Sequence, residues 1–94
     1  MIIVKTREEI ELMRESALIV SKTLGALAAE VKPGVTTLEL DKIAETCIRD
    51  HGAIPGFLGL YDFPNSLCMS PNEQVVHGIP NDKPLENGDI ISID

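Results

Sequence analysis

The sequence has 94 residues, with 8 Lys and Arg against 15 Asp and Glu, and a formal net charge of −7. A chain of this length accommodates one domain and is too short for two. Its composition, 44% hydrophobic and 24% charged, is typical of a globular protein and excludes a disordered one. The acidic balance argues against a nucleic-acid or anionic-membrane surface, because both partners would be repelled.

The sequence also shows no signal for a membrane span, a signal peptide or a disulfide framework. No apolar run approaches the roughly 20 residues that a membrane-spanning helix needs, and the first residues do not read as a signal peptide. The two cysteines have no CxxC spacing, which argues against a disulfide framework or a zinc knuckle. These features predict a protein of the reducing cytoplasm.

A long amphipathic helix is predicted first. Thr6 and Glu9 have the spacing of a capping box, in which each side chain satisfies a backbone N–H of the other residue. The helix has about 25 residues and ends at Lys32-Pro33-Gly34, because proline cannot continue the hydrogen-bond ladder. Its apolar residues recur every three or four positions, at Ile10, Met13, Ala17, Val20, Leu24, Leu27 and Val31. We expect this stripe to face the domain's own core, rather than a coiled-coil partner.

A second helix follows the short Pro-Gly link. Thr36 and Glu39 repeat the capping-box spacing, and Gly52 is a natural stop. The apolar positions between them have helical spacing, at Leu40, Ile43, Ala44, Cys47 and Ile48. The short link predicts two helices folded back on one another.

The remainder of the chain reads as loops and short strands. All three aromatic residues lie within seven residues, 57–63, among turn-forming glycines and prolines. Strand candidates follow at 66–70, 74–77 and 89–94. In the last of these, Ser92 and Asp94 share one face with Ile90. The prediction is an α+β domain of two helices followed by a small antiparallel sheet.

His77 and Asp94 are the two residues whose chemistry fits a cleft. A histidine at the end of an apolar strand, before Gly78, can exchange a proton near neutral pH, although a structural histidine fits the pattern as well. Asp94 is a possible hard ligand for a divalent metal, or a solvated carboxylate, and one carboxylate does not make a metal site. His51, in the last turn of the second helix, is interpreted as structural.

The apolar residues near the aromatic segment allow two interpretations. Cys68 has no nearby base and no CxxC partner, so we read it as a pocket wall or a core residue rather than a nucleophile. Phe57, Leu60 and Phe63 are either core residues or the lining of an apolar pocket for a flexible side chain. Without further information the pattern predicts a possible cleft and no particular reaction.

Four segments, in order across nearly the whole chain, resemble type I methionine aminopeptidases. They are residues 6–14 (TREEIELMR), 31–41 (VKPGVTTLELD), 72–80 (NEQVVHGIP) and 87–94 (NGDIISID). The last two segments together are specific within the wider family of pita-bread proteins. The resemblance implies the pita-bread α+β fold, in which two related halves hold a dinuclear metal site. It also implies removal of the initiator methionine from nascent chains whose second residue is small.

Site residues follow from the resemblance by matching motifs. His77 matches the histidine that hydrogen-bonds the substrate at the scissile peptide, and Asp94 matches the first aspartate ligand of the metal pair. Phe63 and Cys68 match walls of the methionine pocket. At Phe57, Leu60 and Phe63 the common bacterial pattern has a cysteine and two tyrosines, so this pocket would lack hydroxyl groups.

The resemblance further implies two divalent metal ions, with Co, Mn, Fe, Zn or Ni as candidates, in a monomeric cytoplasmic enzyme acting near the ribosome. The family's other metal ligands are absent from these 94 residues. We therefore expect residues 1–94 to be the N-terminal part of one catalytic domain and to be inactive alone. The alternatives are a non-catalytic pita-bread binding module and a structural fragment whose unpaired strand at 90–94 favours self-association.

Overall fold

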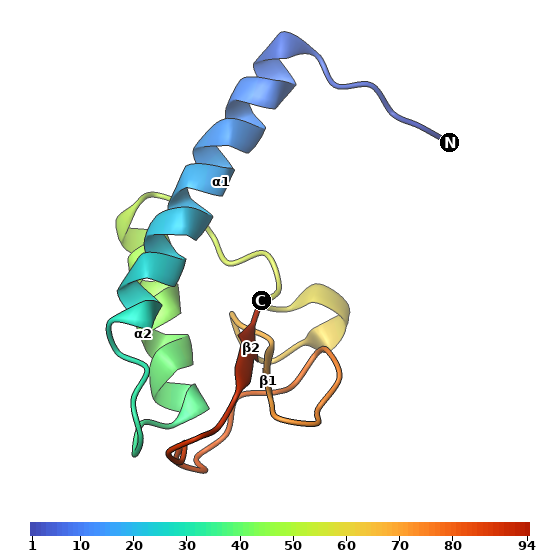
Figure 1. The fold of residues 1–94 in the computed structure, drawn as a ribbon. Helices are drawn as coiled ribbons and strands as arrows, with labels where there is room; N and C mark the ends of the chain where they lie inside the picture. The colour runs from blue at the N-terminus through green and yellow to red at the C-terminus, as the bar shows by residue number, and fades with distance from the viewer.

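The computed structural model describes all residues, 1–94. In chain order the elements are α1 (Arg7–Ala28), α2 (Thr37–Asp50), the 3-10 turn η1 (Leu60–Asp62), β1 (Met69–Pro71) and β2 (Ile91–Ile93). The helices run in opposite directions, with the C-terminal half of α1 beside α2, and the sheet lies to one side of the pair (Figure 1). The predicted helical hairpin and small sheet are therefore confirmed. Neither helix is long and apolar enough to cross a membrane.

The start of α1 is a complete capping box, as predicted. The Glu9 backbone N–H donates to Thr6 Oγ1 at 3.1 Å, and the Thr6 N–H donates to Glu9 Oε1 at 2.9 Å. The helix has 22 residues and ends at Ala28, a few residues earlier than predicted. The N–H groups of Glu30 and Val31 both donate to the Leu27 carbonyl, so the chain turns out of the helix before it reaches Pro33.

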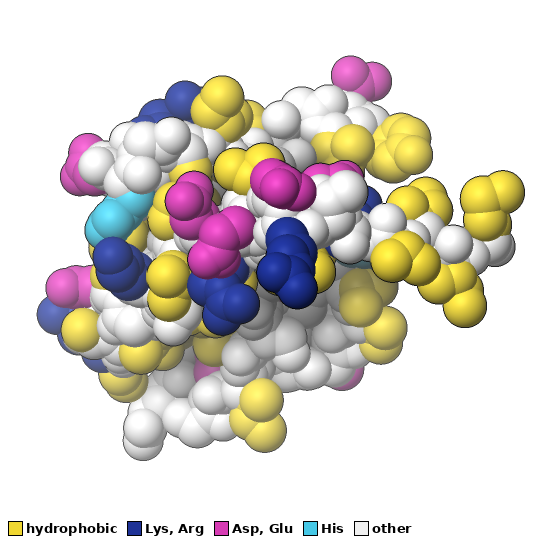
Figure 2. Space-filling model, turned by 90° about the horizontal axis from the view of Figure 1, so that it is seen from above, with side chains coloured by type: hydrophobic (Ala, Val, Ile, Leu, Met, Phe, Trp, Pro, Cys, Tyr) yellow, Lys and Arg dark blue, Asp and Glu magenta, His cyan; other side chains and the backbone are white.

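The prediction that the whole apolar stripe of α1 lies in the core was wrong. Of the side chains in that stripe only Leu27 is buried, while Met13 and Val20 are 56% and 55% exposed. The cause is length: α1 extends about 33 Å and α2 only about 21 Å, so the first turns of α1 pass beyond their partner. Figure 2, viewed from above, shows hydrophobic side chains at the surface among charged ones, and along the N-terminal arm, whose Met1–Val4 are all exposed.

The second helix is anchored at both ends and along one face. The Glu39 N–H donates to Thr36 Oγ1 at 3.1 Å, so Thr36 is the N-cap, but the Glu39 side chain does not complete a capping box. Its last residue is Asp50, followed by His51 as C-cap and Gly52 at φ 79°. The buried residues of α2 are Thr37, Leu40, Asp41 and Ala44.

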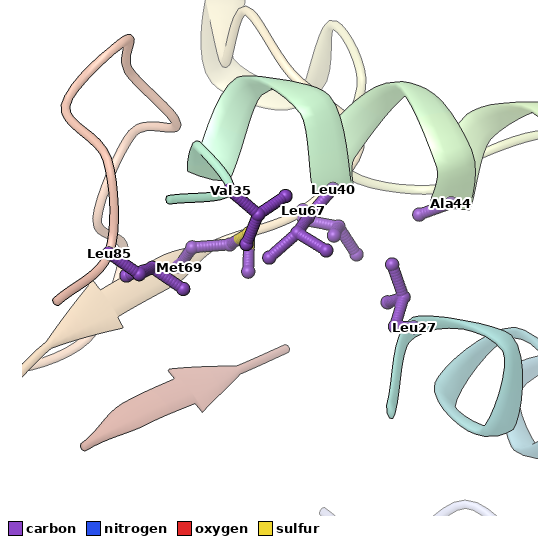
Figure 3. Close-up of a cluster of buried hydrophobic side chains, with 7 residues drawn as sticks. All are labelled: Leu27, Val35, Leu40, Ala44, Leu67, Met69 and Leu85. Atoms are coloured by element: carbon purple, nitrogen blue, oxygen red, sulfur yellow. The ribbon is translucent and has the colours of Figure 1, made fainter. Parts of the chain in front are cut away.

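A single apolar cluster joins these elements. It consists of seven buried side chains from α1, α2, β1 and the loops, namely Leu27, Val35, Leu40, Ala44, Leu67, Met69 and Leu85 (Figure 3). The loop before β2 is tied to the start of α2, because the Leu85 N–H donates to the Val35 carbonyl and its carbonyl accepts from the Gly34 N–H, both at 2.8 Å. No buried side-chain polar atom lacks a hydrogen-bond partner.

The sheet contains two short antiparallel strands, with Met69 opposite Ile93 and Pro71 opposite Ile91. Both lie inside the predicted ranges 66–70 and 89–94, except that β1 extends one residue further, to Pro71. The predicted strand at 74–77 was wrong. A turn at Asn72 (φ 52°) and left-handed Val76 and His77 (φ 35° and 55°) break the extended conformation. A short segment such as Gln74-Val75-Val76-His77 forms a strand only where it can hydrogen-bond to a neighbouring strand.

Candidate functional site

A cavity of about 430 Å³ lies between the helices and the aromatic segment, next to the end of β2. Its walls are mainly apolar and include Phe57 and Leu60, two of the residues singled out from the sequence. Asp94 lines the same cavity and is exposed to solvent. The structure thus brings one carboxylate and two predicted pocket residues to a single apolar recess, which suits a ligand with an apolar side chain and a polar group.

The aromatic segment is closed into a loop by its own backbone. The Gly59 N–H donates to the Phe63 carbonyl at 2.8 Å, and the Phe63 N–H donates to the Leu60 carbonyl at 2.9 Å. Gly59 is at φ 83°, a conformation that costs a glycine little. Phe63 does not line the cavity; its ring packs edge-to-face against Phe57, with ring centres 6.3 Å apart. Phe63 therefore supports the wall that Phe57 forms.

Cys68 and Asp94 form a hydrogen-bonded antiparallel pair. The Cys68 N–H donates to the Asp94 carbonyl at 2.8 Å, and the Asp94 N–H donates to the Cys68 carbonyl at 2.9 Å. Side chains of such a pair lie on the same face of a sheet. Burial, and then the negative charge of Asp94, raise the pKa of the Cys68 thiol, so it stays protonated near neutral pH. This agrees with the interpretation of Cys68 as an apolar residue and not a nucleophile.

His77 lies outside the cavity, on the loop that follows β1. His77 is exposed, and the backbone of both Val76 and His77 is in the left-handed conformation. That conformation is strained for Val76, because its side chain is β-branched. The neighbouring Gly78 ties this loop to β1, because its N–H donates to Ser70 Oγ at 3.1 Å and its carbonyl accepts from Met69. A side chain at Gly78 would collide with the Met69 carbonyl, because the backbone of Gly78 packs closely against that of β1. His77 is therefore held next to this close contact.

His51 has the structural place that the sequence predicts. It caps α2, and its Nδ1 lies 2.7 Å from the Cys47 carbonyl, which requires a proton on that nitrogen. The contribution of the two helices to the cavity wall was not predicted from the sequence. Val20, Leu24 and Ile48 face the cavity, although their spacing assigns them to the core. Helical periodicity identifies an apolar face but does not distinguish a core from the wall of a pocket.

These 94 residues do not by themselves fit a pair of metal ions. No three His, Cys, Asp or Glu side chains converge where they could hold an ion, and Asp94 is the only acidic residue that lines the cavity. A dinuclear centre needs several bridging and terminal ligands. Asp94 can supply one of them.

Comparison with known proteins places this arrangement in a family. The model of metallopeptidase family M24 matches residues 11–94. The chain is 55% identical to the methionine aminopeptidase of Clostridium perfringens and 52% identical to methionine aminopeptidase 1 of Bacillus subtilis. Both alignments cover the whole chain and 38% of the relative, so the chain spans well under half of their length.

Solved structures agree with the fold. The crystal structure of methionine aminopeptidase from Rickettsia prowazekii superposes on the whole chain with a TM-score of 0.96, at 45% identity and over 38% of its own length. That from Thermotoga maritima gives a TM-score of 0.95 at 32% identity, over 99% of this chain. The predicted fold, the N-terminal portion of the pita-bread α+β architecture, is confirmed. The chain belongs to metallopeptidase family M24.

Proposed function

We propose that these 94 residues are the N-terminal portion of a metal-dependent aminopeptidase that removes the initiator methionine from nascent proteins with a small second residue. The observation that carries the proposal is the position of Asp94, a residue that lines the same apolar cavity as Phe57 and Leu60. An unbranched thioether adapts well to an apolar, aromatic-lined recess. The names of the relatives, all methionine aminopeptidases, support the same reading.

Each predicted residue has a role in this proposal. Phe57 and Leu60 contact the methionine side chain, and Phe63 supports Phe57 from behind. Cys68, paired with Asp94 through the backbone, contributes a further wall of the methionine pocket. Asp94 supplies one carboxylate oxygen to a divalent metal, for which Co, Mn, Fe, Zn and Ni are all candidates. His77 hydrogen-bonds the substrate near the scissile peptide, where negative charge develops during hydrolysis.

The cellular setting follows from the same proposal. Cys47 and Cys68 are both free thiols, which suits the reducing cytoplasm. Nascent chains carry the proposed substrate, so we place the enzyme close to the ribosome. We propose a monomer, as the resemblance to type I methionine aminopeptidases implies.

A chimera tests the activity directly. The 94 residues replace the aligned segment of the Clostridium perfringens enzyme, and release of methionine from a Met-Ala-Ser peptide is measured with Mn²⁺ or Co²⁺. We expect an active chimera, in which Asp94→Ala abolishes turnover and His77→Ala lowers it, while the exposed Asp82→Ala does not change it. A folded chimera with no turnover would overturn the proposal and favour a non-catalytic binding module.

The 94 residues alone are expected to be inactive. They present no cluster of metal ligands, so an ion has at most the Asp94 carboxylate in the cavity. With the same peptide and metals we expect no turnover above a metal-only blank, and no submicromolar metal binding by titration calorimetry. Turnover by the isolated chain would contradict this prediction.

A further inference from the structure

Asp41 is a buried carboxylate that no proposed role yet includes. It lies in α2 and is only 7% exposed. Its Oδ1 accepts from the backbone N–H groups of Ser66 and Leu67, at 2.9 and 2.8 Å, and its Oδ2 accepts from Asn65 Nδ2 at 3.1 Å. Neither ion pair of the chain involves it. Three N–H donors therefore balance the cost of burying this charge, in place of a cation.

The segment that Asp41 holds leads directly to the cavity. Leu67 precedes Cys68, whose backbone N–H and carbonyl both bond to Asp94. One turn further along α2, Glu45 Oε1 accepts from Ser66 Oγ at 3.3 Å, so α2 contacts the same segment twice. Hydrogen bonds thus tie residues 65–67 to α2, the backbone continues directly to Cys68, and two further hydrogen bonds join Cys68 to Asp94.

The short sheet makes such an anchor necessary. Its strands have three residues each, and a two-stranded sheet of this kind is marginally stable in water. The Cys68–Asp94 pair lies at the end of that sheet, where strands open most readily. Asp41 fixes the segment before Cys68 to a helix that is packed in the core.

We propose that Asp41 is a positioning residue, whose carboxylate holds residues 65–67 against α2 and so determines where Asp94 lies in the cavity. We call these contacts of Asp41 with residues 65–67 the clamp, and it depends only on the hydrogen bonds described above. Its importance for catalysis rests on the proposed function, because it matters there only if Asp94 is a metal ligand.

The two cysteines provide the test, because they report on different parts of the chain. Cys68 follows the clamped segment and is 4% exposed, while Cys47 lies on α2 outside that segment. Labelling by a thiol reagent at one pH, followed by mass spectrometry, gives the rate at each. In Asp41→Ala we expect Cys68 to label roughly tenfold faster relative to Cys47, because the segment opens locally.

Matched variants separate a clamp from a general loss of stability. Asp41→Asn keeps an oxygen for the two backbone N–H groups, and a flipped Asn65 amide can accept from its NH₂, so we expect this variant to restore most of the protection. Asp50→Ala, an exposed position on the same helix, is the control and should change neither rate. Asn65→Ala removes only the Oδ2 contact and should give a smaller effect in a chain that stays folded.

Amide hydrogen exchange of the full 94-residue chain reads out Asp94 itself. In Asn65→Ala and Asp41→Ala we expect faster exchange at the Asp94 N–H, with the Ala44 N–H of α2 unchanged in Asn65→Ala. The proposal is overturned if both cysteines label faster by the same factor, if Asp41→Asn behaves like Asp41→Ala, or if Asp94 exchange does not change. Neither measurement uses catalysis, so an inactive chimera and a failed clamp remain distinguishable results.

Discussion

The two helices begin in the same way but are stabilised differently. Thr6 and Thr36 both cap a helix by accepting the N–H of a glutamate three residues later. Yet α1 buries two of its 22 residues, and α2 buries four of its 14. Capping and apolar periodicity therefore specify where a helix forms, whereas burial depends on what the rest of the chain places beside it.

The largest expected difference between the helices is in the cost of removing a leucine. Leu40 on α2 is fully buried, and Leu40→Ala should lower the free energy of unfolding by about 2–5 kcal/mol, from lost burial and a cavity. The matched change on α1, Leu12→Ala at a position 63% exposed, should stay within about 0.5 kcal/mol. Urea titrations followed by circular dichroism give both values. Equal losses would show that the first turns of α1 are buried in solution.

The two N-caps provide a second and smaller contrast. Thr36→Ala should cost about 1 kcal/mol of unfolding free energy, because α2 cannot lose its first turn without disturbing Val35 and Leu40 in the core. Thr6→Ala should instead let the exposed first turn of α1 fray, with little change in the urea midpoint. Amide exchange at Glu9 detects that fraying. A Thr6→Ala midpoint as low as that of Thr36→Ala would contradict the expectation.

The smallest expected effect is a loss of local stability at low pH, at Asp89 and at Glu9. The backbone N–H of Glu86, and then the Asn72 side chain, lower the pKa of Asp89, while Thr6 lowers that of Glu9. A carboxylate with a lowered folded pKa adds stability above its unfolded pKa, about 3.9 for Asp, and loses it as pH falls through the folded value. Titration by ¹³C NMR should give both carboxyl midpoints below their ordinary values.

The two sites should respond differently to that protonation. Asp89 joins the loop before β2 to the turn after β1, so its protonation should increase exchange at the Ile90 N–H, which donates to Asn72. Protonation of Glu9 should affect only the first turn of α1. Asp89→Asn is the control, and it should remove the acid dependence at Ile90. A dependence that persists in this variant would assign the effect to another carboxylate.

Much of the secondary structure could be predicted because its signals are local. The two caps and the stop at Gly52 depend on residues close in sequence, while the strand candidates around Met69 and Ile93 form because each is the other's partner. The segment at 74–77 failed because a strand needs a partner, and no neighbouring segment pairs with it. Asp41 gave no signal at all, since an acidic residue on a helix usually faces water.

By itself, the sequence determined the helices, their order, the short antiparallel pair, and a resemblance that the family match bears out. Tertiary structure decided which apolar residues form the core and which line a cavity. In the folded chain Val20 and Leu24 line the same cavity as Asp94, and Asp41 holds the segment before Cys68. The physical reason is distance along the chain: capping and periodicity act within a few residues, whereas these contacts join residues that are tens of positions apart.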